Sequence, residues 1–248
     1  MHTRFVVGLV FALSVKPLIA VAESKVDYSA ELIASYSEAD KRIQVGNRFA
    51  TFRSGGAGFR VEAEHDKYGM LYGSLGFGYS PNETASFSGS NLSGPASSIF
   101  YGAGYRYDYQ LNQRYKLIFS TDMVVHDIAG DLEGEVRGSP AVAEITSDIS
   151  MQDMTLALRY SVTRDFHVSL GAGTRKWKLD ALADGTINTV IDATSQVSVE
   201  GQDPLQYIGF EFDISNVPVE AYFRRSSLDA DNSVTVHEIE IQVLFTNF

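Results

Sequence analysis

Residues 98–109 have the sequence SIFYGAGYRYDY, in which two kinds of side chain alternate. Apolar or aromatic residues take every second position, namely Ile99, Tyr101, Ala103, Tyr105, Tyr107 and Tyr109. Between them lie small or charged residues, among them Ser98, Gly102, Gly104, Arg106 and Asp108. Successive side chains of a β-strand point to opposite sides, so a period of two gives one apolar face and one polar face. The stretch therefore predicts a β-strand that separates two different environments.

The same alternation recurs along the chain and predicts ten strands. They cover residues 28–36, 59–64, 71–79, 98–109, 115–123, 153–162, 166–173, 208–214, 219–224 and 238–245. The predicted fold class is all-β, an antiparallel transmembrane β-barrel. Residues 186–191 and 196–199 are also rich in β-branched side chains, so twelve strands remain an alternative. Eight strands would require two clear alternations to be discarded.

The connections between these strands alternate in length. Short turns are predicted near residues 66–69, 111–113, 163–165 and 215–216. Long connections cover residues 38–56, 81–97, 126–147 and 180–204, and residues 228–233 form an intermediate one. Short turns at one rim and long loops at the other are typical of outer-membrane barrels, whose long loops lie outside the cell. We therefore expect short periplasmic turns and long extracellular loops, some of them projecting hairpins.

Residues 1–22 have the features of a secretory signal peptide. Arg4 supplies a positive charge, residues 5–15 form an apolar core, and residues 20–22 have the sequence AVA, a small-x-small cleavage site. We expect cleavage after Ala22, which leaves residues 23–248 as one barrel domain. Export from a Gram-negative bacterium to the cell outer membrane is the predicted localisation.

Composition excludes several classes of function. The chain has no cysteine, so it can form neither a disulfide nor a thiolate metal site. Loss of the leader removes Arg4 and Lys16, which leaves 18 basic and 31 acidic residues and a net charge of −13. A chain of that charge does not suit a phosphate backbone, so no nucleic-acid partner is expected.

The two faces of each strand are assigned by the positions of aromatic and charged residues. Aromatic residues near strand ends predict the girdle that membrane barrels place at the lipid–water interface: Tyr28, Tyr36, Tyr79, Tyr107, Tyr109, Tyr115, Tyr160 and Phe166. The opposite face predicts a charge network that fills the lumen: Glu31, Arg60, Glu62, Glu64, Arg106, Asp108, Lys116, Asp122, Arg159, His167, Arg175, Glu211, Asp213, Glu220, Arg224, Glu238 and Glu240. A narrow cation path along the acidic excess is a secondary hypothesis.

This assignment of faces predicts how two adjacent residues tolerate substitution. Leu170→Arg is expected to cost about 2 to 4 kcal/mol if that position meets lipid at mid-depth. Gly171→Ser, on the other face, is expected to be far milder.

Taken together, these features resemble the small outer-membrane barrels of Gram-negative bacteria, the broad group of OmpA-like and OmpX-like proteins. The resemblance covers residues 26–248 and depends on the alternation, the connections and the final Phe248. In that group a terminal Phe, with apolar residues at alternate positions before it, is recognised by the outer-membrane assembly machinery. Here the apolar set from Ile239 to Phe245 lies in the other phase. This predicts either a bulge near the end of the chain or a degenerate signal.

Enzymatic activity is the first alternative. Omptin-like proteases use acidic pairs and an Asp-His pair at the outer rim, and the nearest counterparts are His126-Asp127 and the acids Asp229 and Asp231. Lipid A-modifying hydrolases use a His-Ser pair, with His167 and Ser169 as counterparts on one strand face. Adjacent residues of a strand point to opposite faces, so His126 and Asp127 are not expected to form a dyad. His65 and His237 are interpreted as structural, and no catalytic residue is assigned.

The leading hypothesis is a barrel that supports the membrane or makes surface contacts through its loops, and a narrow pore is the second alternative. The acidic residues Asp127, Asp131, Glu133 and Glu135 could bridge to lipopolysaccharide through divalent ions but lack the spacing of a calcium loop. No cofactor or metal is assigned. The expected partners are outer-membrane lipid, lipopolysaccharide, the assembly machinery and a surface ligand, and a monomer is expected. Any loop hairpin with an unpaired edge could accept a strand from a partner.

Overall fold

The structure is a computed structural model that describes residues 26–40, 43–45, 48–50, 53–215, 217–229 and 233–247. The predicted signal peptide, residues 1–22, and Phe248 lie outside the described residues. The strands are β1 (Val26–Ala39), β2 (Ile43–Val45), β3 (Arg48–Ala50), β4 (Arg53–His65), β5 (Gly69–Phe87), β6 (Ser90–Gln110), β7 (Tyr115–Val136), β8 (Ser139–Ser161), β9 (Phe166–Ile187), β10 (Ile191–Ile214), β11 (Val217–Asp229) and β12 (Ser233–Asn247).

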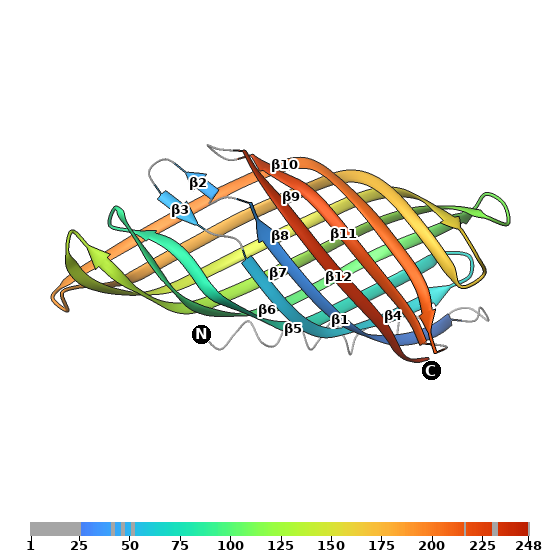
Figure 1. Cartoon of the computed structure of the whole chain (residues 1–248), viewed down its shortest axis with the longest axis horizontal. Coiled ribbons are helices and arrows are strands. Elements are labelled where there is room, and N and C mark those ends of the chain that lie inside the picture. The colour runs from blue at the N-terminus through green and yellow to red at the C-terminus, as the bar shows by residue number, and fades with distance from the viewer. Residues whose placement is uncertain are drawn as a thin grey trace.

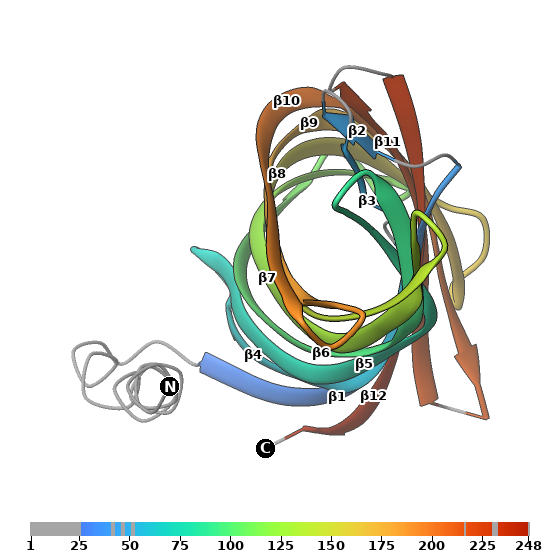
Figure 2. The same cartoon turned by 90° about the vertical axis from the view of Figure 1, so that its left-hand side faces the viewer.

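Ten of these strands form a closed antiparallel ring. Each strand pairs with the next along the chain from β4 to β12, and β1 closes the ring by pairing with both β4 and β12. The two remaining strands, β2 and β3, form a small hairpin that pairs with β5 at Ala50 and Ala85. Figure 1 shows the barrel from the side, and Figure 2 shows the ring along its axis. The prediction of ten antiparallel barrel strands is confirmed.

The wall of the barrel has two very different heights. The strands β5 to β10 contain 19 to 24 residues each, whereas β1, β4, β11 and β12 contain 13 to 15. A tilted strand needs only about 9–11 residues to cross a bilayer. The long strands therefore continue well past that length as hairpins at one end, on the left in Figure 1. We call this part the projecting sheet, residues 80–87, 90–98, 126–136, 139–152, 176–187 and 191–204.

The apolar face of the wall inverts where the projecting sheet begins. On β8, Leu156 and Leu158 point outward and are exposed, while Asp153 points inward and is buried. Further along the same strand, Ile145 and Ile149 point inward and are buried, while the outward positions carry polar residues such as Glu144, Asp148 and Gln152. An outward apolar band around a polar interior is the pattern of a transmembrane barrel, and the reverse is the pattern of a sheet in water.

This inversion corrects the prediction of long loops. Residues 81–97, 126–147 and 180–204 are strand for most of their length, and the chain turns only at Ser88-Gly89, Arg137-Gly138 and residues 188–190. Apart from Val190, each of these turn residues has a positive φ, a conformation common in tight hairpins. The alternation continues through these segments with its phase reversed, so a search for outward apolar faces misses it. The hairpins expected within residues 180–204 and 38–56 are present as β9–β10 and β2–β3, whereas the β5–β6 and β7–β8 hairpins were not expected.

The projecting sheet has its own apolar interior. One buried cluster includes Trp177, Leu179, Val234 and Val236, together with Ile43 of the β2–β3 hairpin. A second cluster nearer the hairpin tips contains Ala85, Phe87, Leu92, Leu132, Val136, Ala141, Ala143, Ile145 and Ala183. Because β5 also contacts β9 and β10, the sheet curls over and is closed there by side-chain packing. No described helix is long and apolar enough to span a bilayer.

Aromatic rings lie over inward-facing glycines, and this corrects one expectation. A Cβ at Gly171 would lie 2.2 Å from Cε1 of Tyr207, and one at Gly104 would lie 2.3 Å from Cζ of Tyr72. Gly171→Ser is therefore not a mild change, because the added atoms meet the Tyr207 ring. Overpacking of this kind costs about 1–3 kcal/mol.

The last strand contains an irregularity. Ala30 pairs with Thr246 but Glu31 pairs with Leu244, so the register shifts by one residue at Phe245. Of the two explanations for the displaced apolar phase near the C-terminus, the structure contains the bulge.

The boundary between the lipid-facing band and the water-facing projecting sheet can be tested by introducing arginine at two sites on the outer face of β9. Leu170→Arg should reduce the free energy of unfolding by about 2–4 kcal/mol, because Leu170 lies in the apolar band. Leu182→Arg, on the same face within the projecting sheet, should cost less than about 0.5 kcal/mol. Urea unfolding in lipid vesicles measures both values. Equal costs would contradict the assignment of the apolar band to lipid.

Candidate functional site

Arg175 joins four strands at the level where the wall changes height. It projects from β9, is 2% exposed, and donates from Nε and Nη2 to the two Asp153 oxygens at 2.7 and 2.6 Å. Nη2 also donates to Oε2 of Glu238 on β12 at 2.7 Å, and Nη1 to Oγ of Ser226 on β11 at 3.2 Å. A bidentate guanidinium with buried acceptors holds these strands in fixed register.

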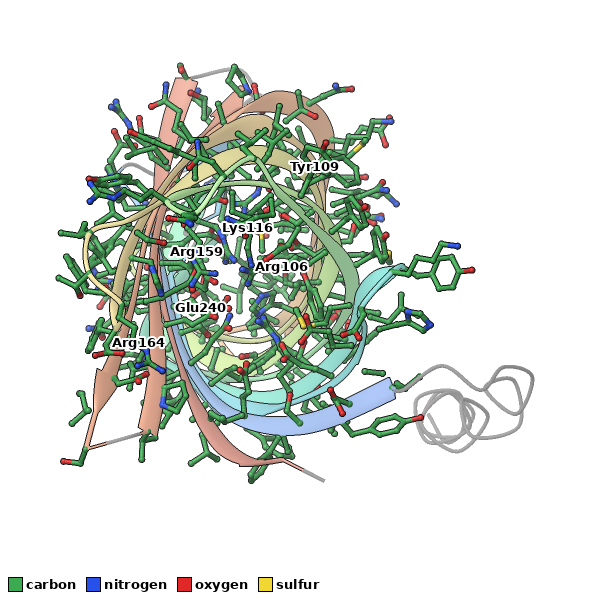
Figure 3. The ribbon with its side chains drawn as sticks, turned by 90° about the vertical axis from the view of Figure 1, so that its right-hand side faces the viewer. Arg106, Tyr109, Lys116, Arg159, Arg164 and Glu240 are labelled. Atoms are coloured by element: carbon green, nitrogen blue, oxygen red, sulfur yellow. The ribbon has the colours of Figure 1, made fainter. Side chains whose placement is uncertain are left out.

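Arg106 crosses the lumen. It lies on β6, and its Nη1 is 3.6 Å from Oε2 of Glu220 on β11. These strands are five apart in the ring of ten and therefore face each other. Arg106 also contacts Asp108 and Glu211, and Glu211 accepts a 2.6 Å contact from Arg159 on β8. Figure 3 shows Arg106, Arg159 and Lys116 inside the ring, and Lys116 Nζ lies 3.1 Å from Asp108.

Glu240 holds two further guanidiniums in the middle of the lumen. Its Oε1 lies 3.0 Å from Nη2 of Arg60 on β4, and its Oε2 lies 3.0 Å from Nη1 of Arg224 on β11. Arg60 also lies over the Tyr72 ring, 4.6 Å from its centroid. Each guanidinium therefore has a carboxylate, an aromatic face or both, which lowers the cost of its burial.

Three predicted lumen acids take no part in these ion pairs. Glu31, Glu62 and Asp122 face the lumen, but none lies within 4 Å of a cationic nitrogen among the described residues. Glu62 accepts a hydrogen bond from Ser29 at 3.1 Å, and Oε2 of Glu31 is buried with no hydrogen-bond partner among the described residues. Glu62 and Asp122 line a cavity of about 60 Å³ together with Arg60, Arg106, Arg224 and Tyr222.

Three other predicted lumen residues lie close to the short-turn rim. Glu64 and Asp213 are exposed there, so the structure does not bring them into the buried network. His167 pairs in register with Glu211, and its Nδ1 is buried with no hydrogen-bond partner among the described residues.

Several buried polar residues of the interior were missed from the sequence. Asp153, which accepts hydrogen bonds from Arg175, lies six residues before Arg159 on β8 and therefore points to the same inner face. The alternation of the sequence could have identified it. Trp177 donates from Nε1 to Oδ2 of Asp203 at 2.6 Å. Asp203 lies in the connection predicted over residues 180–204, and Trp177 lies just beyond the predicted strand 166–173.

The residues considered for catalysis do not converge. His126 is buried inside the barrel against Phe100, whereas Asp127 points outward from the same strand. The side chain of Asp229 and the whole of Asp231 lie outside the described residues. Ser169 is buried at the wall near the short turns, and His65 accepts a hydrogen bond from the Lys67 backbone at 2.9 Å. His237 is exposed on the outer face of β12.

The acidic residues predicted in the long connections lie in rows on the outer face of the projecting sheet. Asp127 pairs in register with Asp148, which pairs with Asp180. Asp131 pairs with Glu144, which pairs with Asp184, and Glu133 and Glu135 follow along β7. Among the described residues, no group of three or more His, Asp or Glu is placed to hold a metal ion.

The aromatic residues predicted for the girdle lie at two levels. Tyr28, Tyr107, Tyr109, Tyr115, Tyr160 and Phe166 lie near the short-turn end, where the Tyr115 and Tyr160 rings are 5.1 Å apart. Tyr36 and Tyr79 lie at the other margin, on either side of Gly55, and are exposed. Figure 3 shows Tyr109 on the wall, outside the charged lumen.

The same substitution, Glu→Gln, should have different effects on stability at a lumen acid that forms an ion pair and at one that does not. Glu238→Gln should cost about 3–5 kcal/mol, because it leaves the buried Arg175 without one of its carboxylates. Glu31→Gln should be neutral or stabilising, because that carboxylate is buried without an ion pair among the described residues. Urea unfolding in lipid vesicles compares the two. A large loss of stability in Glu31→Gln would show that Glu31 has a favourable partner.

Comparisons with known proteins give neighbours of low similarity. No protein-family model matches, and no curated protein matches. Among solved structures, the attachment invasion locus protein Ail of Yersinia pestis is 12% identical, with a TM-score of 0.41, 92% of this chain and 100% of that chain covered. The translocator domain of autotransporter NalP from Neisseria meningitidis is 11% identical, with a TM-score of 0.48 and 94% and 92% covered. The outer membrane protease OmpT from Escherichia coli is 9% identical, with a TM-score of 0.44 and 88% and 93% covered.

Values this low transfer no function to the chain, so its class is decided by its own architecture. Its closed ring of ten strands, apolar outside and charged inside, has the architecture of the small Gram-negative outer-membrane β-barrels.

Proposed function

We propose that the protein is a non-conducting outer-membrane β-barrel that holds a sheet outside the membrane for contact with other molecules. The observation that carries this proposal is the inversion of the apolar face along β7 to β10. A sheet with a dry interior and a charged exterior is suited to water, and the band below it is suited to lipid. The projecting sheet is therefore the part of the molecule available to partners.

The lumen supports a structural role for the membrane band. Arg106, Arg159 and Arg175 each contact a carboxylate on a strand at least two places away around the ring. The cavity described in the lumen has a volume of only about 60 Å³ and is lined by charged side chains such as Arg60, Arg106 and Arg224. We therefore propose an interior that is closed to ions, in place of the narrow cation path.

The expected partners follow from the same arrangement. Lipid would cover the apolar band, and lipopolysaccharide would meet the base of the projecting sheet. We propose that the assembly machinery recognises the C-terminal strand with Phe248, and that the barrel acts as a monomer.

Surface display can be tested by single cysteines, because the chain has none of its own. Asp184→Cys, on the outer face of the projecting sheet, should react with a membrane-impermeant maleimide on intact cells. Val162→Cys, which is exposed beside the short turn after β8, should react only after the outer membrane is permeabilised. Labelling of Val162→Cys from outside would contradict the proposed orientation.

Conductance tests the closed lumen. The wild-type protein should give no steady current in a planar bilayer, because ion pairs cross its interior. The double variant Arg60→Ala/Arg106→Ala removes two side chains that line the cavity and should give discrete openings. A steady open current from the wild-type protein would refute the proposal of a closed interior.

A further inference from the structure

One edge of the projecting sheet has no neighbouring strand. β10 pairs with β9 along its whole length, from Ile191 to Phe212, but with β11 only from Leu205 onward. Among the described residues, no strand pairs with the other edge of β10 over residues 191–204. A free strand edge presents a row of backbone donors and acceptors that can pair with another chain.

The point at which β10 and β11 separate is buried and held by hydrogen bonds. Leu205 and Ser226, the first pair between β10 and β11, are 1% and 2% exposed. Ser226 accepts a hydrogen bond from Arg175, which is fixed in turn by Asp153. Pro204 lies immediately beyond this pair and has no N–H to donate, which suits the residue at which pairing with β11 ends.

The free part of β10 is fastened to β9 on both faces. On the inner face, Trp177 donates to Asp203 and its ring lies over Gly201, where a Cβ would be 2.9 Å from the indole. On the outer face, the Ser198 hydroxyl donates to Asp180 at 2.6 Å and the Thr194 hydroxyl to Asp184 at 2.9 Å. The edge is therefore ordered before any partner binds, which reduces the entropy cost of binding.

The outer-face contacts also keep the Asp180 carboxylate ionised. The ammonium of Lys178 lies 2.6 Å from Asp180, and together with the Ser198 hydroxyl it holds the pKa of Asp180 below its usual value. Asp180 therefore stays ionised at neutral pH, and its charge is balanced by that of Lys178.

The charge of this region determines which kind of strand it can accept. Asp192 and Glu200 are exposed on β10. Lys178 and Lys176 of β9 lie opposite Glu200 and Gln202, whereas residues 179–199 of the β9–β10 hairpin contain three aspartates and no lysine or arginine. The acidic part of the edge is therefore the part nearer the hairpin turn. The neighbouring outer face carries the rows that contain Asp184, Glu144 and Asp131. A second copy of the chain would place acidic edge against acidic edge, which is unfavourable for directly opposed strands. A basic strand would meet charges of opposite sign.

From these observations we propose that the free edge of β10 binds an extended, basic polypeptide segment, which pairs with residues 191–204 as an additional strand. Backbone hydrogen bonds would supply affinity, and the carboxylates beside the edge would select lysine and arginine. This proposal rests on the proposed function, because the edge must lie outside the membrane.

Peptides of defined charge test the site on the unmodified, refolded full barrel. A short synthetic peptide of alternating lysine and threonine should bind at least about tenfold more tightly than its glutamate–threonine counterpart. The same lysine peptide with alternate backbone nitrogens methylated cannot pair as a strand and should lose at least about tenfold in affinity. Equal binding of the methylated and unmethylated peptides would overturn strand addition. Equal binding of the lysine and glutamate peptides would overturn the preference for a basic partner.

A variant locates the binding edge. Residues two apart direct their N–H groups to the same side of a strand, so a proline at position 196 shares the side of Pro204 and leaves the β9 ladder in place. Gln196→Pro should reduce affinity for the lysine peptide by at least about tenfold, whereas Gln196→Thr, which keeps the N–H, should bind like the wild type. Unchanged binding by a folded Gln196→Pro protein would overturn the assignment to this edge. If Gln196→Pro fails to fold, the methylated peptide still decides the question.

The two proposals fail in different ways. If the cysteine at position 184 is labelled from outside but the lysine peptide does not bind, the basic-strand site is wrong and the projecting sheet stands. If that cysteine is not labelled on intact cells, the proposed function is wrong, and peptide binding in detergent does not rescue it.

Discussion

Each long strand of this barrel passes through two solvents. A strand has only two faces, so a residue that points outward meets hydrocarbon in one half of β8 and water in the other half. Leu158 and Glu144 are both outward residues of that strand, and each suits its own surroundings. The apolar face therefore has to invert along the strand. The inner face inverts with it, from a charged lumen in the membrane band to an apolar interior in the projecting sheet.

The charged interior of the membrane band and the apolar interior of the projecting sheet meet at Arg175. Below it, arginines are neutralised by carboxylates from distant strands, and above it Trp177 and Leu179 pack against the ends of β11 and β12. A buried guanidinium needs several acceptors in fixed positions, so this residue ties together strands that are far apart in the sequence. Its hydrogen bond to Ser226 lies at the pair where β11 stops running alongside β10.

The unequal height of the wall gives the molecule a distinct surface. Because β11 stops pairing with β10 at Leu205, the upper part of β10 has only one hydrogen-bonded neighbour among the described strands, and its inner face packs against the apolar cluster that contains Phe87 of β5. Hydrogen bonds to Asp180, Asp184 and Trp177 keep it in place without a second hydrogen-bonded strand. A free edge that is rigid and acidic differs from a flexible loop, because its backbone groups are already aligned for a partner. The unpaired edge of β10 is therefore the part of the fold that we propose makes surface contacts.

The sequence by itself determined the number of barrel strands and the face that most barrel residues take, because alternation is local and has a period of two. The alternation alone therefore assigns Arg106, Glu220 and Glu240 to the inner face. Only the tertiary structure decided which charges meet, because partners such as Arg106 and Glu220 come from opposite walls. It also decided that residues 180–187 and 191–204 are strand and that the Tyr207 ring lies over Gly171. These contacts depend on the curl and register of the whole wall, which no short stretch of sequence specifies.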